Sequence, residues 1–114
     1  MPINEWSDSI LIAELTDEPS FSEDMDNLCR RLEDMDEPLP DVIVNAQSVS
    51  YVNSSNISQL LRVRKKLLDC GSRLRLCGLN DRVWSVMLVT GLDKVFEFTD
   101  DVSTSLASLQ ILDT

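Results

Sequence analysis

The sequence predicts an α/β fold with a mostly parallel central sheet of about four to five strands and four helices. Short apolar segments rich in β-branched residues alternate along the chain with longer segments whose apolar residues recur every three or four positions. This alternation is typical of strands joined by crossover helices, and such strands pair in parallel. The length of 114 residues, 43% of them apolar, suits a single packed domain spanning residues 1–114.

The N-terminal half is predicted to supply two strands and one helix. A strand from Ser9 to Leu15 follows a weaker edge-strand signal at Trp6. The segment 20–35 is predicted to be a helix because its apolar residues form one stripe, made of Phe21, Met25, Leu28 and Leu32. The proline-containing segment 36–41 ends that helix, and the apolar run 41–46 indicates an inner strand covered on both faces.

The C-terminal half is predicted to supply three more helices. The first covers 56–70 and is followed by Gly71, the expected glycine after its last turn. Its buried side is expected to consist of Ile57, Leu60, Leu61, Val63, Leu67 and Leu68. The other two helices cover 82–90 and 102–111, and a short strand at 95–98 separates them. Asn80 or Asp81 can cap the helix over 82–90, and Asp100 or Asp101 can cap the helix over 102–111. The last helix carries the apolar residues Val102, Leu106, Leu109 and Leu112.

A further strand follows the glycine at position 71. Leu74 and Leu76 alternate there with Arg73 and Arg75. Alternation of apolar and charged residues is typical of a strand with one face in the core and one in solvent. We therefore expect the arginine side of this strand to face water.

Charge is distributed very unevenly along the chain. The net charge is −10, and residues 1–41 hold thirteen acidic and only two basic residues. An acidic surface repels phosphate backbones, so nucleic-acid binding is not expected. No apolar run is long enough to cross a bilayer, so membrane insertion is not expected either.

The residue types that usually carry catalysis and metal binding are scarce. Histidine is absent, the three glycines form no phosphate-binding loop, and Cys29, Cys70 and Cys77 form no C-x-x-C pair. The sequence therefore predicts no enzyme activity, no metal and no cofactor. It also predicts three free thiols, as expected of a reduced cytoplasmic compartment.

Four consecutive capping residues, Asn53, Ser54, Ser55 and Asn56, precede the apolar-periodic part of the helix over 56–70. Asparagine and serine accept hydrogen bonds from the free N–H groups of a first helical turn. Two adjacent hydroxyls at the positive end of a helix are also well placed to carry a phosphate, which would add nearly two negative charges. The pattern suggests either ordinary capping or a phosphorylation switch.

The same helix offers a candidate docking face for a partner. Spacings of three and four place Ser58, Gln59 and Arg62, with Lys65 or Lys66, on the side of Ser55. Arg62 and Lys65 belong to a basic cluster that suits an acidic partner, although a solvated helix face would look the same.

These features together resemble the STAS domain of bacterial anti-sigma factor antagonists, over about residues 9–112. The family's apolar strand, turn and serine-containing helix start match Val42–Ala46, Tyr51–Val52 and Asn53–Asn56, in that order. A later glycine, strand and "GL.KVF" signature match Gly71–Gly78 and Gly91–Phe96. The resemblance implies a domain that regulates by binding other proteins.

In such antagonists the first serine of the motif is phosphorylated by a partner that is both anti-sigma factor and serine kinase, and a PP2C-type phosphatase reverses the modification. That role falls on Ser54, with Ser55 as the alternative. Asn53 and Asn56 stand where the family usually has aspartate and glycine. The alternative implied function is an accessory STAS subunit that docks on the ATPase of an ABC-type lipid transporter.

Overall fold

The computed structural model describes residues 2–112, with side chains described to residue 110. A five-stranded sheet in the order β1-β2-β3-β4-β5 confirms the predicted α/β fold. β3 is central: Val42–Asn45 pair in parallel with β2 on one side and with β4 on the other. The strands are β1 (Ile3–Ser7), β2 (Ile10–Thr16), β3 (Asp41–Ser48), β4 (Leu74–Cys77) and β5 (Glu97–Thr99).

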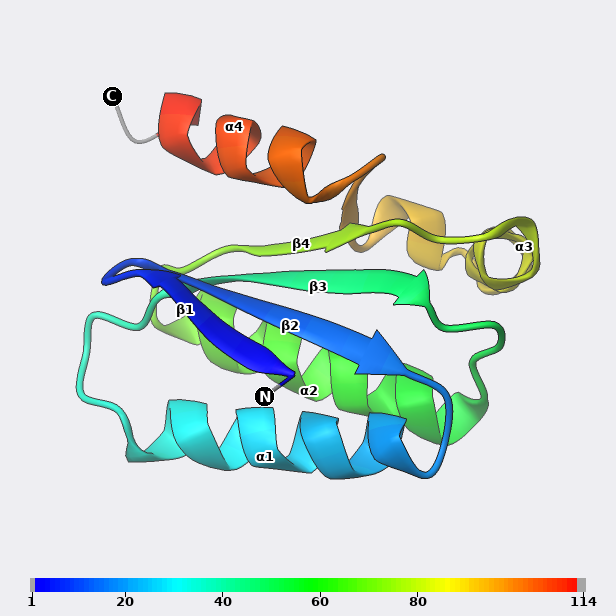
Figure 1. The fold of residues 1–114 in the computed structure, drawn as a ribbon, viewed down its shortest axis with the longest axis horizontal. Helices are drawn as coiled ribbons and strands as arrows, with labels where there is room; N and C mark the ends of the chain where they lie inside the picture. Colours follow the sequence, from blue (N-terminus) through cyan, green and yellow to red (C-terminus); the bar gives the residue numbers. More distant parts are fainter. Residues whose placement is uncertain (1, 113–114) are drawn as a thin grey trace.

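Helices cover both faces of the sheet (Figure 1). They are α1 (Ser20–Asp34), α2 (Ser54–Asp69), α3 (Asp81–Thr90) and α4 (Val102–Leu112), with a short 3₁₀ turn, η1 (Leu92–Lys94), before β5. α1 and α2 lie side by side on one face, and α4 lies on the other (Figure 1). The four predicted helices are therefore confirmed to within two residues at their ends.

The alternation of side chains along the strands divides the core in two. Leu11, Val42 and Leu76 point into the larger core against α1 and α2. Ile12 and Ile43 point into a smaller core closed by Leu109 of α4. The side chain of Leu112, predicted for the same helix, lies outside the described residues. Because side chains alternate between faces, each inner strand contributes to both cores.

Local signals also place the ends of α2. Gly71 follows it with a φ of +75°, a left-handed conformation that glycine adopts without a steric penalty. Ser72 N donates to Leu67 O at 2.8 Å, the bond that closes a Schellman-type helix end. Gly71 therefore ends α2 as the sequence predicts, and the chain turns directly into β4.

Of the two strand predictions near the edges of the sheet, the weak one at Trp6 is confirmed and the one at 95–98 needs correction. The weak signal around Trp6 is a full strand, β1, which pairs antiparallel with β2 as a hairpin. In the segment predicted as a strand over 95–98, the first residues close the 3₁₀ turn η1. The strand β5 covers only residues 97–99. Val95 N and Phe96 N both donate to Leu92 O, so local turn bonds replace ladder bonds there.

The prediction that one side of β4 faces water is wrong. Arg75 is only 8% exposed because α4 packs over that face. Its guanidinium is hydrogen-bonded through Nε to Ser108 Oγ at 3.2 Å and through Nη1 to Leu74 O at 3.4 Å. Arg73 Nη2 is paired with Asp41 Oδ2 at 2.8 Å. Both charges are therefore matched by polar partners close to α4, as burial requires.

Candidate functional site

The start of α2 is closed by a reciprocal pair of asparagines. Asn53 Oδ1 accepts a hydrogen bond from Asn56 N at 2.9 Å, and Asn56 Oδ1 accepts one from Asn53 N at 3.0 Å. This capping box makes Asn53 the N-cap and Ser54 the first helical residue. Asparagine thus supplies the capping oxygens at both positions, so the turn forms without aspartate or glycine.

The two serines between these asparagines point outward. Ser54 and Ser55 are both exposed, and neither hydroxyl is hydrogen-bonded within the described part of the chain. Asn56, by contrast, is almost fully buried. Ser54 lies at the helix start as the sequence predicts, with its hydroxyl free of the capping role that Asn53 fills.

The segment leading into α2 is tied to two neighbouring elements. Asp17, after β2, accepts hydrogen bonds from Ser50 N at 2.8 Å and Ser50 Oγ at 2.5 Å. Asn80 Nδ2, at the start of α3, donates to Val49 O and Ser50 O at 3.2 and 3.3 Å. The Arg82 guanidinium lies 5.6 Å from the centre of the Tyr51 ring. These contacts hold the β3–α2 loop on both sides and so fix the position of the serines.

Two carboxylates border this region. The hydroxyl and N–H of Ser50 hold the pKa of Asp17 below its ordinary value. The hydroxyl and N–H of Ser22 do the same for the pKa of Glu18, with a smaller contribution from the Asn56 side chain. Asn56 Nδ2 is buried and has no hydrogen bond of good geometry in the described residues, so its interaction with Glu18 is weak. The first turn of α2 itself carries no acidic residue.

The residues predicted to form a docking face do not all share one environment. Ser58, Arg62 and Lys65 are exposed along α2, where Ser58 Oγ donates to Ser54 O and Lys65 Nζ pairs with Asp69 at 2.9 Å. Gln59 is only 6% exposed. Its Nε2 donates to Ser22 O and to Asp26 Oδ1, both at 3.3 Å. Gln59 therefore joins α2 to α1, and the prediction that it reaches a partner is wrong.

Two leucines that the sequence analysis assigned to the core, Leu61 and Leu68, lie on the exposed face of α2. Leu61 is 37% exposed and Leu68 is 51% exposed, whereas Leu60 and Leu67 fill the core beside them. The exposed residues Ser54, Ser58, Leu61, Lys65 and Leu68 follow spacings of four, three, four and three along α2. Such spacing makes one continuous stripe. We call these five residues the α2 stripe.

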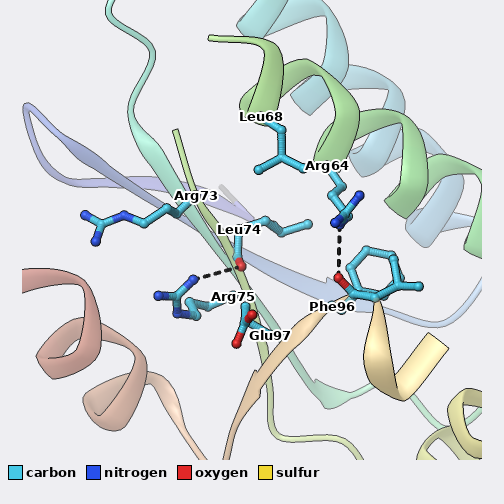
Figure 2. Close-up of a pocket in the computed structure, with 8 residues that line it drawn as sticks. Arg64, Leu68, Arg73, Leu74, Arg75, Phe96 and Glu97 are labelled. Carbon is cyan, nitrogen blue, oxygen red and sulfur yellow. Dashed lines mark hydrogen bonds between the residues drawn. The ribbon is translucent and has the colours of Figure 1, made fainter. Parts of the chain in front are cut away.

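A hollow of about 350 Å³ near the end of α2 is bordered by three arginines. The guanidinium groups do not converge on it: Figure 2 shows Arg64 turned toward the chain before Phe96, with Arg73 and Arg75 directed away from Arg64. Arg64 Nε donates to Val95 O at 3.1 Å. The arginines therefore bind protein groups, and Leu68 and Leu74 are among the apolar residues that border the hollow.

No metal-binding geometry occurs among the described residues: no three Cys, Asp or Glu side chains gather closely enough to hold an ion. The three cysteines are free thiols, with Cys29 and Cys77 buried and Cys70 partly exposed. None of the helices described in the structure has the length and apolar character to cross a membrane.

Comparison with known proteins agrees with this architecture. The family model described as "STAS domain" matches residues 4–105. A search of curated protein sequences finds no significant match. The sequence thus carries a family signature although its similarity to individual curated proteins is low.

Three solved structures illustrate the shared fold. An anti-sigma-factor antagonist (STAS) domain protein from Planctomyces limnophilus superimposes with a TM-score of 0.81 at 16% identity, covering 95% of this chain and 96% of that one. The anti-sigma factor antagonist SpoIIAA in its unphosphorylated form gives 0.79 at 13% identity, covering 95% and 94%. A sulfate transporter family protein from Wolinella succinogenes gives 0.80 at 20% identity, covering 97% and 93%. At these identities the similarity establishes the fold.

Proposed function

Because this chain belongs to the STAS domain family, we propose that it is a regulatory protein-binding module, an anti-sigma factor antagonist whose binding is switched by phosphorylation of Ser54. It acts by binding rather than by catalysis and uses no cofactor. The partners expected from the family are an anti-sigma factor with serine kinase activity and a PP2C-type phosphatase.

The proposal rests on the start of α2, where the capping bonds are made by asparagines and not by serines. Asn53 and Asn56 satisfy the capping bonds, which leaves the Ser54 hydroxyl exposed and unbonded within the described residues. A kinase can therefore modify Ser54 without breaking a bond that the fold uses. Ser55 is also exposed and is the alternative acceptor.

The charge around the site explains how a phosphate would act on a partner. The first turn of α2 carries no basic side chain to pair with it, and Asp17 and Glu18 already make the neighbouring loop acidic. A phosphoserine at position 54 would therefore remain an unpaired dianion on the surface. An interface that accepts a neutral hydroxyl there would have to desolvate that charge, which is strongly unfavourable without matching donors.

The α2 stripe supplies the rest of the proposed docking surface. Leu61 gives the apolar contact that a binding face needs, and Arg62, beside the stripe, and Lys65, within it, give positive charge in an otherwise acidic domain. Ser58 lies one turn after Ser54, so a partner that reaches the stripe also covers the modification site.

The fold comparisons are consistent with a switch, because SpoIIAA is a protein with structures described in both an unphosphorylated and a phosphorylated form. The proposal is tested by mapping phosphorylation sites on the protein isolated from its native cells and by measuring binding of the captured kinase. Phosphate on Ser54, together with loss of kinase binding in Ser54→Asp, would support it. Ser103→Asp, which adds the same charge in the first turn of α4, is the matched control and should bind normally.

The accessory-subunit alternative makes the opposite prediction. A subunit that docks permanently on a transporter ATPase would carry no phosphate on Ser54 or Ser55, and its capture would recover an ABC-type ATPase. That result would refute the switch and keep the α2 stripe as a permanent interface.

A further inference from the structure

A second hollow lies between α3 and β5, and none of the residues that border it belongs to the serine motif. It has a volume of about 300 Å³ and is bordered by Leu79, Asp81, Trp84, Phe98, Thr99 and Asp100. Trp84 and Phe98 form its aromatic wall, with ring centroids 5.0 Å apart and planes at 86°. Trp84 is 37% exposed, so a ligand can reach the indole. We call this hollow the Trp84 pocket.

Two carboxylates flank this aromatic wall. Asp81 and Asp100 use their backbone carbonyls in the fold, as acceptors for Ser85 Oγ and Gly78 N. Neither carboxylate is hydrogen-bonded or ion-paired within the described residues. Arg82, the basic residue next to Asp81, instead lies over the Tyr51 ring. The pocket therefore carries two unneutralised negative charges beside an aromatic surface.

Aromatic faces and carboxylates attract the same kind of ligand, a cation with a flat, weakly hydrated surface. A guanidinium group fits both, because it stacks on indole and donates paired hydrogen bonds to carboxylates. The net charge of −10 on the domain also favours binding of a positively charged ligand.

The surroundings favour a side chain of a protein over a free small cation. Leu88, one turn after Trp84, is 51% exposed, and Val89 is 88% exposed. Leu88 shares the face of Trp84 because it lies four residues later, so it extends the apolar surface along α3 beyond what a single cation would cover. Contiguous exposed apolar surface marks protein contacts. We propose that the Trp84 pocket receives an arginine side chain of a partner protein, with an apolar residue of the same segment lying on Leu88.

This inference goes beyond the serine switch and does not depend on it. Ser54 and the Trp84 pocket lie on different helices, and the proposed arginine contact requires no phosphate. A failed phosphorylation experiment would leave this proposal standing, and the reverse also holds.

The test uses nuclear magnetic resonance on the full chain. The protein has two tryptophans, so the indole N–H of Trp84 reports on the pocket and that of Trp6, on β1, serves as an internal control. N-acetyl-L-arginine amide should shift the Trp84 signal saturably in the millimolar range, leaving Trp6 unchanged. N-acetyl-L-citrulline amide, which is neutral and nearly the same shape, should not. Equal shifts with the two compounds, or with the two tryptophans, would overturn the proposal.

Two variants and one peptide sharpen this test. Asp81→Asn combined with Asp100→Asn should weaken arginine binding about threefold to tenfold, since each exposed ion pair contributes modestly. Asp34→Asn combined with Asp36→Asn makes the same change in net charge at the end of α1 and should leave binding unaltered. An acetylated Arg-Ala-Leu amide should bind more tightly than the single arginine. If it does not, the pocket takes a free cation and the protein-partner proposal is wrong.

Discussion

Replacing Asn53 by alanine should destabilise the domain, whereas replacing the adjacent Ser54 by alanine should not. Asn53→Ala removes the side-chain oxygen that Asn56 N reaches at 2.9 Å. The reciprocal bond survives, because Asn53 donates it from its backbone. The loss of one of the two bonds should cost about 1 kcal/mol, within the range for removal of an N-cap. Ser54→Ala removes an exposed hydroxyl with no partner and should stay within about 0.5 kcal/mol of the wild type.

Urea unfolding followed by far-ultraviolet circular dichroism separates these cases. For a domain of this size the loss of about 1 kcal/mol lowers the midpoint by roughly 0.3–1 M. Asn53→Asp should restore the midpoint, because a carboxylate oxygen accepts the same bond and its charge suits the helix start. Ser54→Asp should leave the midpoint unchanged or slightly higher for the same electrostatic reason. If Ser54→Ala lowers the midpoint as much as Asn53→Ala does, Ser54 is the true cap and the reasoning fails.

Three further outcomes follow from burial and from the pKa shifts. Leu67→Ala should cost about 2–5 kcal/mol in unfolding free energy because its side chain fills the core, whereas Leu68→Ala should cost less than about 0.5 kcal/mol; equal losses in urea unfolding would contradict the exposure of Leu68. A thiol reagent at pH 8 should modify Cys70 in the folded protein and reach Cys29 and Cys77 only on unfolding, as mass spectrometry of the labelled chain would show. Stability should be complete above about pH 5 and fall with acidification through pH 4, because carboxylates whose folded pKa is lowered stabilise the fold only while ionised; a midpoint independent of pH between 3 and 6 would contradict the bonds made by Asp17, Glu18 and Asp101.

Much of the fold could be predicted because local signals and the global pattern agree. The stripe in α1, the glycine after α2 and the apolar run of β3 each specify one element without help from distant residues. The start of α2 is predicted only to within two residues: the four capping residues mark it, and the capping box between Asn53 and Asn56 makes Ser54 the first helical residue.

The errors arise where distant elements decide the environment. Arg75 has the spacing of a solvent-facing residue, yet α4 returns more than twenty-five residues later and covers it. Gln59 is polar, yet α1 supplies Ser22 O and Asp26 as partners that allow its burial. Leu68 has the apolar side chain of a core residue, but the rotation of α2 about its axis places it on the solvent side. Periodicity states which residues share a face, and only packing states which face is covered.

The arrangement of charges around the motif suggests what Asn53 does in place of the family's usual aspartate. The site is already bordered by Asp17 and Glu18, and an aspartate at position 53, as the family usually has, would add a third negative charge nearby. Asn53 makes the capping bond without that charge, so the proposed phosphate on Ser54 would be added to a first turn that carries no charged side chain. A phosphate would then be the main charge that a partner meets on the first turn, and its addition would change the local potential more sharply than it would beside a charged cap. In the proposed switch, the two asparagine hydrogen bonds keep the geometry of the motif, and the phosphate on Ser54 would supply the electrostatic signal.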